Sequence, residues 1–203
     1  MIKALIFDVD GTLLDSFEAN FELFKNLMDK AGYPIPTKEQ YTTLFHRTLR
    51  DTIQMLIGSD DDKEIQRVCN LLDAVSAPAP VFNAGVADTI KILSEHYLLG
   101  VVTSRVKAYA YEPPLNTLEH YFKATVAYED TENHKPHPEP LLLITKQLQV
   151  LPEECVYVGD AKTDIEAGHA AGMRCILYSQ EKTVDADAVT ADFSEIPILI
   201  TKL

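Results

Sequence analysis

Two carboxylates separated by a single residue are the first groups in the chain that could do chemistry. Asp8 and Asp10 close an apolar run that begins at Ala4. Carboxylates this close repel each other unless a cation lies between them or one of them is protonated. Gly11 follows, permits a tight turn, and leaves an amide that we expect to face an oxyanion. Alone, the stretch is more typical of an ordinary turn, so its interpretation depends on the rest of the chain.

A second pair of acids, Asp160 and Asp164, follows Gly159 in the last quarter of the chain. Asp160 could share a hard cation with Asp8, since carboxylates and water are the ligands that Mg²⁺ prefers. Thr163 or Asp164 could also cap a helix expected at 165–171. That simpler role does not explain Asp160, which precedes the helix.

Lys135 and the pair Thr103-Ser104 complete the set of polar groups. Pro136 favours an extended backbone at Lys135, and an ammonium group beside carboxylates would offset the charge of a transferring phosphoryl group. Thr103 and Ser104 follow an apolar run, and would offer a hydroxyl and free amides to a phosphate at the N-terminus of the next helix. Taken singly, the first is typical of a plain loop and the second of a helix cap.

Apolar runs predict the elements that must position these groups. Such runs, separated by helical patterns, indicate a parallel sheet buried on both faces. The strands are expected at 4–9, 97–102, 124–128, 155–158 and 175–178, with helices at 86–96 and 138–149. We therefore expect an α/β fold with a doubly wound parallel sheet. The carboxyl ends of its strands would open onto one crevice, where the four groups of polar residues would meet.

Residues 15–80 break this alternation, because they carry helical periodicity and no strand pattern. The helices are expected at 17–31, 38–57 and 62–77. We predict an α/β core formed by residues 1–14 and 81–203, and an inserted α-helical cap, residues 15–80, that lies as a lid above the strand ends.

The formal net charge of −13 limits the partners of the chain. It argues against binding to nucleic acid or to an anionic membrane surface. It would also repel a small phosphorylated substrate, unless a metal ion and local cations reversed the field at the site. In the insert, His46, Arg47 and Arg50 could contact the anionic end of such a substrate, or could form a solvated helix face.

Three cysteines stand far apart, at Cys69, Cys155 and Cys175, with no Cys-x-x-Cys pair. Together with the lack of a membrane-spanning apolar run, they predict reduced thiols in a cytoplasmic protein. The oligomeric state is left open by the sequence.

Together and in this order, the polar groupings resemble the motifs of the haloacid dehalogenase superfamily of phosphohydrolases, and within it the phosphoglycolate phosphatase and pyrophosphatase branch. The matching segments are 8–13, 102–104, 135–136 and 159–165, and residues 128–140 carry much of the similarity to the branch. The resemblance implies that Asp8 attacks phosphorus and forms an aspartyl-phosphate. It implies that Asp10 protonates the leaving oxygen and then takes a proton from water.

The resemblance also implies a Mg²⁺ cofactor and a phosphate cradle. The metal would be held by Asp8, Asp160 and the backbone carbonyl of Asp10, with Asp164 as a ligand or close neighbour. The phosphoryl oxygens would be bound by groups at four positions, Gly11, Thr12, Thr103 and Ser104, with Lys135 offsetting their charge. The chain departs from the family at Arg105, where Lys or Pro is common, at His137, and at Pro113-Pro114, which should break the helix after Thr103.

Two alternatives to a phosphatase share these residues. A phosphomutase of the β-phosphoglucomutase type would pass the phosphoryl group to a sugar, but such enzymes tend to carry a helper His in the first cap helix. Residues 17–21 contain none. A signalling receiver domain also uses clustered acids, a Thr and a Lys, but lacks the helical insert and an acid equivalent to Asp10. These differences favour hydrolysis over storage of the phosphoryl group.

Overall fold

The structure is a computed structural model that describes residues 1–180 and 185–203. Residues 181–184, which fall in the range predicted for the core, lie outside the described part. Contacts divide the chain into two compact units, one formed by Met1–Asp15 with Val81–Leu203 and the other by Ser16–Pro80. Each unit is described separately.

The larger unit is built on a six-stranded parallel sheet in the order β5-β4-β1-β6-β7-β8. The strands are β1 Ala4–Phe7, β4 Leu98–Val102, β5 Phe122–Val126, β6 Cys155–Gly159, β7 Arg174–Tyr178 and β8 Ala188–Thr190. The sheet confirms the predicted doubly wound α/β fold. In its register Phe7 pairs with Val101 on one side and Val158 on the other, so Asp8 emerges beside the ends of β4 and β6.

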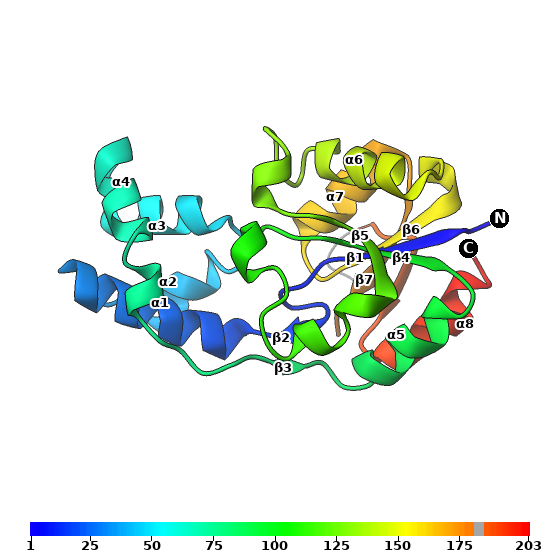
Figure 1. Cartoon of the computed structure of the whole chain (residues 1–203), viewed down its shortest axis with the longest axis horizontal. Helices are drawn as coiled ribbons and strands as arrows, with labels where there is room; N and C mark the ends of the chain where they lie inside the picture. The colour runs from blue at the N-terminus through cyan, green and yellow to red at the C-terminus, as the bar shows by residue number, and fades with distance from the viewer. Residues whose placement is uncertain (181–184) are drawn as a thin grey trace. The chain divides into compact units, whose positions relative to one another are not determined.

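Helices cover both faces of this sheet (Figure 1). Leu5 and Phe7 point to one face, where they belong to a buried cluster with α5 (Val86–Ser94) and α8 (Ile196–Ile200). Ala4 and Ile6 point to the other face, toward α6 (Glu139–Leu148) and α7 (Lys162–Ala171). Alternation of side chains along a strand explains why β1 is apolar throughout: every position is buried on one face or the other.

Several details of the core differ from the sequence-based prediction. β8 was missed, and β5 begins at Phe122, which pairs with Leu99, instead of at Ala124. β2 (Leu14–Asp15) and β3 (Val81–Phe82) form an antiparallel pair where no strand was expected. Strands of two or three residues are too short to carry a periodic signal.

No α-helix follows β4, because 3₁₀ turns connect it to β5. They are η2 Lys107–Tyr109, η3 Leu115–Thr117 and η4 Glu119–Tyr121, and further 3₁₀ turns are η5 Tyr128–Asp130, η6 Pro152–Glu154 and η7 Phe193–Glu195. A break was expected at Pro113-Pro114, which lack N–H groups, but the helix is absent altogether. The expected helix N-terminus at Thr103-Ser104 is therefore wrong.

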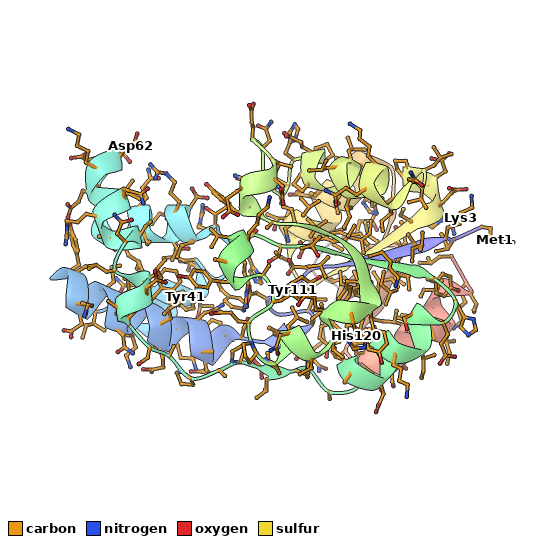
Figure 2. The ribbon with its side chains drawn as sticks, in the orientation of Figure 1. Met1, Lys3, Tyr41, Asp62, Tyr111 and His120 are labelled. Carbon is orange, nitrogen blue, oxygen red and sulfur yellow. The ribbon has the colours of Figure 1, made fainter. Side chains whose placement is uncertain are left out.

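The smaller unit is helical, as predicted. It contains α1 Phe17–Ala31, α2 Lys38–Thr42, α3 Leu49–Ile57, α4 Asp62–Cys69 and the 3₁₀ turn η1 Leu72–Ala74. Tyr41, labelled in Figure 2, is 2% exposed, and its ring lies 5.6 Å from that of Phe21 and 5.3 Å from that of Phe24. The aromatic stripe of α1 is thus the core of this unit.

Two helix predictions in this unit are corrected. The helix expected at 38–57 is divided into α2 and α3, because Thr48 caps a new helix by accepting the Asp51 N–H at 3.1 Å. The helix expected at 62–77 ends at Cys69. Among the residues that the structure describes, no helix has the length and apolarity needed to cross a bilayer.

Candidate active site

The chain forms a closed turn immediately after β1. The Asp8 N–H donates to Val158 O at 2.9 Å and extends the sheet by one residue, and Asp8 itself is buried. The Leu14 N–H then donates to Val9 O at 2.9 Å, and the Gly11 N–H donates to Leu14 O at 2.8 Å. The expectation that the Gly11 amide is free for an oxyanion is therefore wrong, because that amide closes the turn.

Gly11 has a different role, which is to leave room for Asp160. Its φ is +84°, and a Cβ at this position would lie 1.9 Å from Asp160 Oδ2. A side chain here would meet both a backbone penalty and a clash with a carboxylate. Thr12 Oγ1 donates to Asp160 Oδ1 at 3.3 Å, so this turn holds one acid of the second pair in place.

Asn83 stabilises the same turn through two side-chain hydrogen bonds. Its Nδ2 donates to Gly11 O at 3.1 Å and to Thr12 O at 2.8 Å. No sequence pattern singled out this residue, which directly follows β3.

Lys135 bonds one acid from each of the two pairs, Asp8 and Asp164. It lies in the loop between β5 and α6, and its Nζ donates to Asp8 Oδ1 at 2.7 Å and to Asp164 Oδ1 at 2.7 Å. A third contact reaches the hydroxyl of Tyr157 at 3.2 Å, and that hydroxyl donates to Asp164 Oδ1 at 3.0 Å. Side chains from three separate segments therefore form one hydrogen-bonded network.

Tyr157 is a residue of the site that the sequence did not single out. It lies on β6 and is fully buried. A signal existed, because a tyrosine inside an otherwise apolar buried strand needs a partner for its hydroxyl. That partner could not be identified without the fold.

Asp164 is held at the first turn of α7. The Ala161 N–H donates to its Oδ2 at 3.0 Å, and the side chain is 1% exposed. Asp164 is therefore not the N-cap that the sequence suggested, because α7 begins at Lys162 with Ala161 as its N-cap. Its side chain accepts the N–H of that cap residue and also belongs to the acidic cluster. Gly159 makes this possible, since a Cβ there would lie 2.4 Å from Asp164 Cβ.

Burial and mutual repulsion dominate the electrostatics of the cluster. Burial raises the pKa of Asp8 to about 7, although Lys135 opposes the shift. Burial, and then the charges of Asp164 and Asp8, raise the pKa of Asp160 well above its usual value. Burial also opposes the charge on Lys135, but Asp164 and Asp8 outweigh it, and the pKa of the ammonium group is raised well above its ordinary value.

These acids fit a hard divalent cation. Carboxylate oxygens of Asp8, Asp160 and Asp164 lie within 4.8 Å of one another, and the ammonium group of Lys135 balances only part of their charge. Oxygen ligands of this kind are those of Mg²⁺ sites. The cluster lacks the thiol and imidazole ligands that softer metals favour.

Arg105 engages the remaining acid of the first pair. Its Nε donates to Asp10 Oδ2 and its Nη2 to Asp10 Oδ1, both at 2.7 Å. The Arg105 N–H also donates to Thr103 Oγ1 at 3.1 Å, and the Thr103 N–H donates to Val126 O at 3.0 Å. Ser104, between them, is half-buried. The sequence marked Arg105 only as a departure from a pattern, whereas the structure brings it to the site.

The candidate residues of the helical unit lie on and just before α3. His46 and Arg47 are exposed, whereas Arg50 is half-buried and forms an ion pair with Asp62. Their contact with a substrate stays a prediction.

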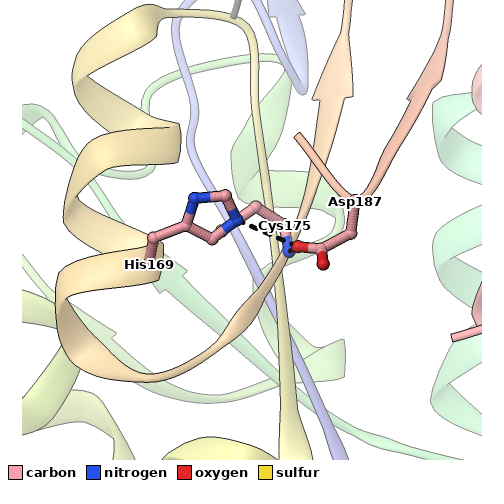
Figure 3. Close-up of side chains that lie close together, drawn as sticks. All are labelled: His169, Cys175 and Asp187. Atoms are coloured by element: carbon pink, nitrogen blue, oxygen red, sulfur yellow. Dashed lines mark hydrogen bonds and ion pairs between the residues drawn. The ribbon is translucent and has the colours of Figure 1, made fainter. Parts of the chain in front are cut away.

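A second cluster of possible metal ligands lies at the end of α7 (Figure 3). The Asp187 Oδ2 atom accepts the Cys175 N–H at 2.8 Å and lies 3.0 Å from His169 Nε2. A metal would need the Cys175 thiolate, but burial, and then Asp187, raise the pKa of this thiol to about 12. We interpret the cluster as a structural one, whose hydrogen bonds connect α7, β7 and the segment before β8.

Comparison with known proteins gives these groups a family context. The family model for haloacid dehalogenase-like hydrolases matches residues 5–178. The phosphoglycolate phosphatase of Salmonella typhimurium is 31% identical over 199 residues, covering 84% of this chain and 79% of that protein. The pyrophosphatase PpaX of Bacillus pumilus is 30% identical, covering 85% and 81%. A solved structure of a predicted phosphoglycolate phosphatase from Haemophilus somnus shares the fold, with a TM-score of 0.86, 20% identity and 98% coverage of each chain.

The family model spans most of the chain and includes both pairs of acids, of which Asp8 and Asp164 bond Lys135. It agrees with the resemblance noted from the motifs and confirms the prediction that the chain is an enzyme. The chain belongs to the haloacid dehalogenase-like hydrolases.

Proposed function

We propose that this enzyme is a cytoplasmic, Mg²⁺-dependent phosphatase that hydrolyses a small phosphorylated metabolite, either a phosphoglycolate-like ester or pyrophosphate. The observation that carries the proposal is the position of Lys135, which is 2.7 Å from both Asp8 and Asp164. A buried cation bonded to a strand-end carboxylate suits a site that must accept further negative charge. The activities that the two curated relatives are named for support the same class of substrate.

In the proposed reaction Asp8 is the nucleophile. One of its carboxylate oxygens attacks phosphorus, and the bond from phosphorus to the leaving oxygen breaks as Asp10 gives that oxygen a proton. Water then attacks the phosphoryl group on Asp8 while Asp10 takes a proton from it. This second step releases inorganic phosphate, returns Asp8 to the carboxylate and leaves Asp10 protonated, as it was before the first step.

The other residues bind and orient. Lys135 would offset the charge of the phosphoryl oxygens, with Thr103 and Ser104 as donors to them. Asp8, Asp160 and the Asp10 carbonyl would hold Mg²⁺, with Asp164 beside them, and the ion would add positive charge next to the phosphoryl group. Thr12, bonded to Asp160, would keep that ligand in place.

A substrate screen tests the proposal. Purified enzyme is incubated with p-nitrophenyl phosphate, a set of small phosphate esters and pyrophosphate, with Mg²⁺ or with EDTA, and released phosphate is measured. We expect multiple turnovers with Mg²⁺ and essentially none with EDTA. Equal rates in EDTA would exclude the metal dependence. A single phosphorylation of the protein without release of phosphate would instead favour a receiver-like role.

Mg²⁺ should stabilise the protein more at high pH than at low pH. The pKa of Asp8 is raised from 3.8 to about 7 in the folded, metal-free protein. Between those values the folded state binds more protons than the unfolded state, so the metal-free protein loses stability as pH rises toward 7. Mg²⁺ binds the ionised carboxylates, so its stabilising effect should grow over the same interval.

Thermal unfolding measured at about pH 5 and about pH 8, with saturating Mg²⁺ or EDTA, checks this expectation. The shift in Tm caused by Mg²⁺ should be clearly larger at the higher pH. An Asp8→Asn variant is the control, since it cannot titrate at this position and should show a smaller difference. A Mg²⁺-induced shift that is identical at both pH values in the unaltered protein would contradict the proposed site.

A further inference from the structure

The site contains two largely buried cations, and each bonds different carboxylates. Lys135 bonds Asp8, the proposed nucleophile, and Asp164, which is proposed to lie beside the metal ligands. Arg105 bonds Asp10, the proposed acid and base, which must contact the leaving oxygen. Lys135 therefore lies on the side of the transferring phosphoryl group, and Arg105 lies on the side of the leaving group.

Contacts other than the ion pair with Asp10 also hold Arg105 at this position. Its side chain is 12% exposed, its Nη1 donates to Tyr109 O at 3.3 Å, and its backbone N–H donates to Thr103 Oγ1. The pKa of the guanidinium is raised: burial opposes its charge, but Asp10 outweighs that effect. The guanidinium is thus a fixed positive charge facing the site.

The ion pair between Arg105 and Asp10 opposes the role proposed for Asp10 as an acid and base. To reach a leaving oxygen, Asp10 must turn one carboxylate oxygen toward it, yet both oxygens accept hydrogen bonds from Arg105. To act as an acid, Asp10 must first carry a proton, and a protonated oxygen is a weaker acceptor for Arg105, so we expect at least one of these contacts to be exchanged when substrate binds. A largely buried guanidinium that loses a carboxylate partner is strongly destabilised unless another anion replaces it.

We propose that this anion belongs to the substrate, and that Arg105 determines specificity by binding a carboxylate or phosphate carried by the leaving group. The inference rests on the proposed function and names the residue that would recognise the second anionic group, which both proposed kinds of substrate carry on the leaving side. The planar guanidinium fork suits both anions, since each offers two oxygens at the spacing that Asp10 now supplies. Binding of the second anion would also release Asp10 toward the leaving oxygen.

Three substrates separate the possible sources of this anion. 2-Phosphoglycolate and ethyl phosphate differ in the carboxylate of the leaving group, and pyrophosphate places a phosphate there. The variants are Arg105→Met, which removes the charge, and Arg105→Lys, which keeps the charge but not the fork. Lys107→Met is the matched control, because Lys107 lies two residues away and is 63% exposed.

We expect the unaltered enzyme to prefer 2-phosphoglycolate or pyrophosphate, which carry a second anionic group, over ethyl phosphate. Arg105→Met should lower kcat/KM for that substrate by about 100-fold, mainly through KM, and should change kcat/KM for ethyl phosphate by less than about threefold. Arg105→Lys should recover part of the loss, and Lys107→Met should change neither value. The substrate that suffers the loss identifies the second anion as carboxylate or as phosphate.

A binding measurement separates this inference from the proposed function. In an Asp8→Asn background, which cannot turn over, calorimetry should show that Arg105→Met weakens binding of the preferred substrate and not of ethyl phosphate. Equal losses for all three substrates, or no loss for any, would overturn the inference and leave the phosphatase proposal standing. If the unaltered enzyme hydrolyses none of the three with Mg²⁺, both proposals fail.

Discussion

Replacing Asp8 by Asn is expected to lower Mg²⁺-dependent hydrolysis of p-nitrophenyl phosphate by at least about 10⁴-fold. The amide has nearly the shape of the carboxylate, but it is a poor nucleophile and contributes no negative charge to a metal. The Lys135–Asp164 pair at 2.7 Å is left in place, so the network loses one partner and not its framework. The loss should therefore appear in kcat, measured by phosphate release under saturating substrate.

The fold of this variant must be checked separately from its activity. At about pH 8 and without metal, Asp8→Asn should be at least as stable as the unaltered protein, because one of several crowded charges is gone. Asp88→Asn is the matched control: Asp88 is exposed on α5, and its replacement should leave the rate unchanged. Full activity in Asp8→Asn would exclude the aspartyl-phosphate mechanism.

Replacing Lys135 by Met is expected to produce the second-largest effect, on both activity and stability. The variant leaves Asp8 and Asp164 buried without their shared cation. Removing one partner from a buried charge pair costs about 3–5 kcal/mol. We expect a loss of that order in the metal-free protein at about pH 8, and a fall in kcat of about 10³-fold because an important electrostatic contribution to the transition state is lost.

Urea unfolding with and without Mg²⁺ tests the Lys135 prediction. Bound Mg²⁺ supplies positive charge to the same carboxylates, so it should restore part of the stability but not the activity. Tyr157→Phe is an informative comparison: it removes a hydroxyl that is 3.2 Å from Lys135 and should cost only about 1 kcal/mol.

Lys3→Met serves as the surface control, since the Lys3–Glu154 pair is largely exposed on the lysine side and contributes at most about 1 kcal/mol. A Lys135→Met protein as stable as this control in EDTA would show that the buried pair is not under electrostatic stress.

Much of the architecture was predictable from local patterns. Apolar runs of four or more residues located β1, β4, β6 and β7, because a strand buried on both faces must be apolar throughout. The helical unit was predictable from the stripe of Phe17, Phe21 and Phe24. The short strands β2, β3 and β8 were not, since their pairing depends on neighbours far along the chain.

The division between α2 and α3 shows that helical periodicity alone does not predict where a helix ends. Residues 38–57 carry helical periodicity on both sides of the break, yet Thr48 begins a second helix by capping it. A cap competes with helix continuation by a single hydrogen bond, so packing within the unit decides which one prevails.

Residue types and positions after apolar runs were enough to name the groups that could do the chemistry: Asp8, Asp10, Lys135, Asp160 and Asp164. How these groups pair became visible in the folded chain alone. The tertiary structure placed Lys135 between Asp8 and Asp164, gave Tyr157 a role, and closed the Gly11 amide into a turn. It also joined Arg105 to Asp10 across 95 positions of the chain. Spacing along a chain predicts which side chains share a strand or a helix face, whereas hydrogen bonds between distant segments depend on how those segments pack.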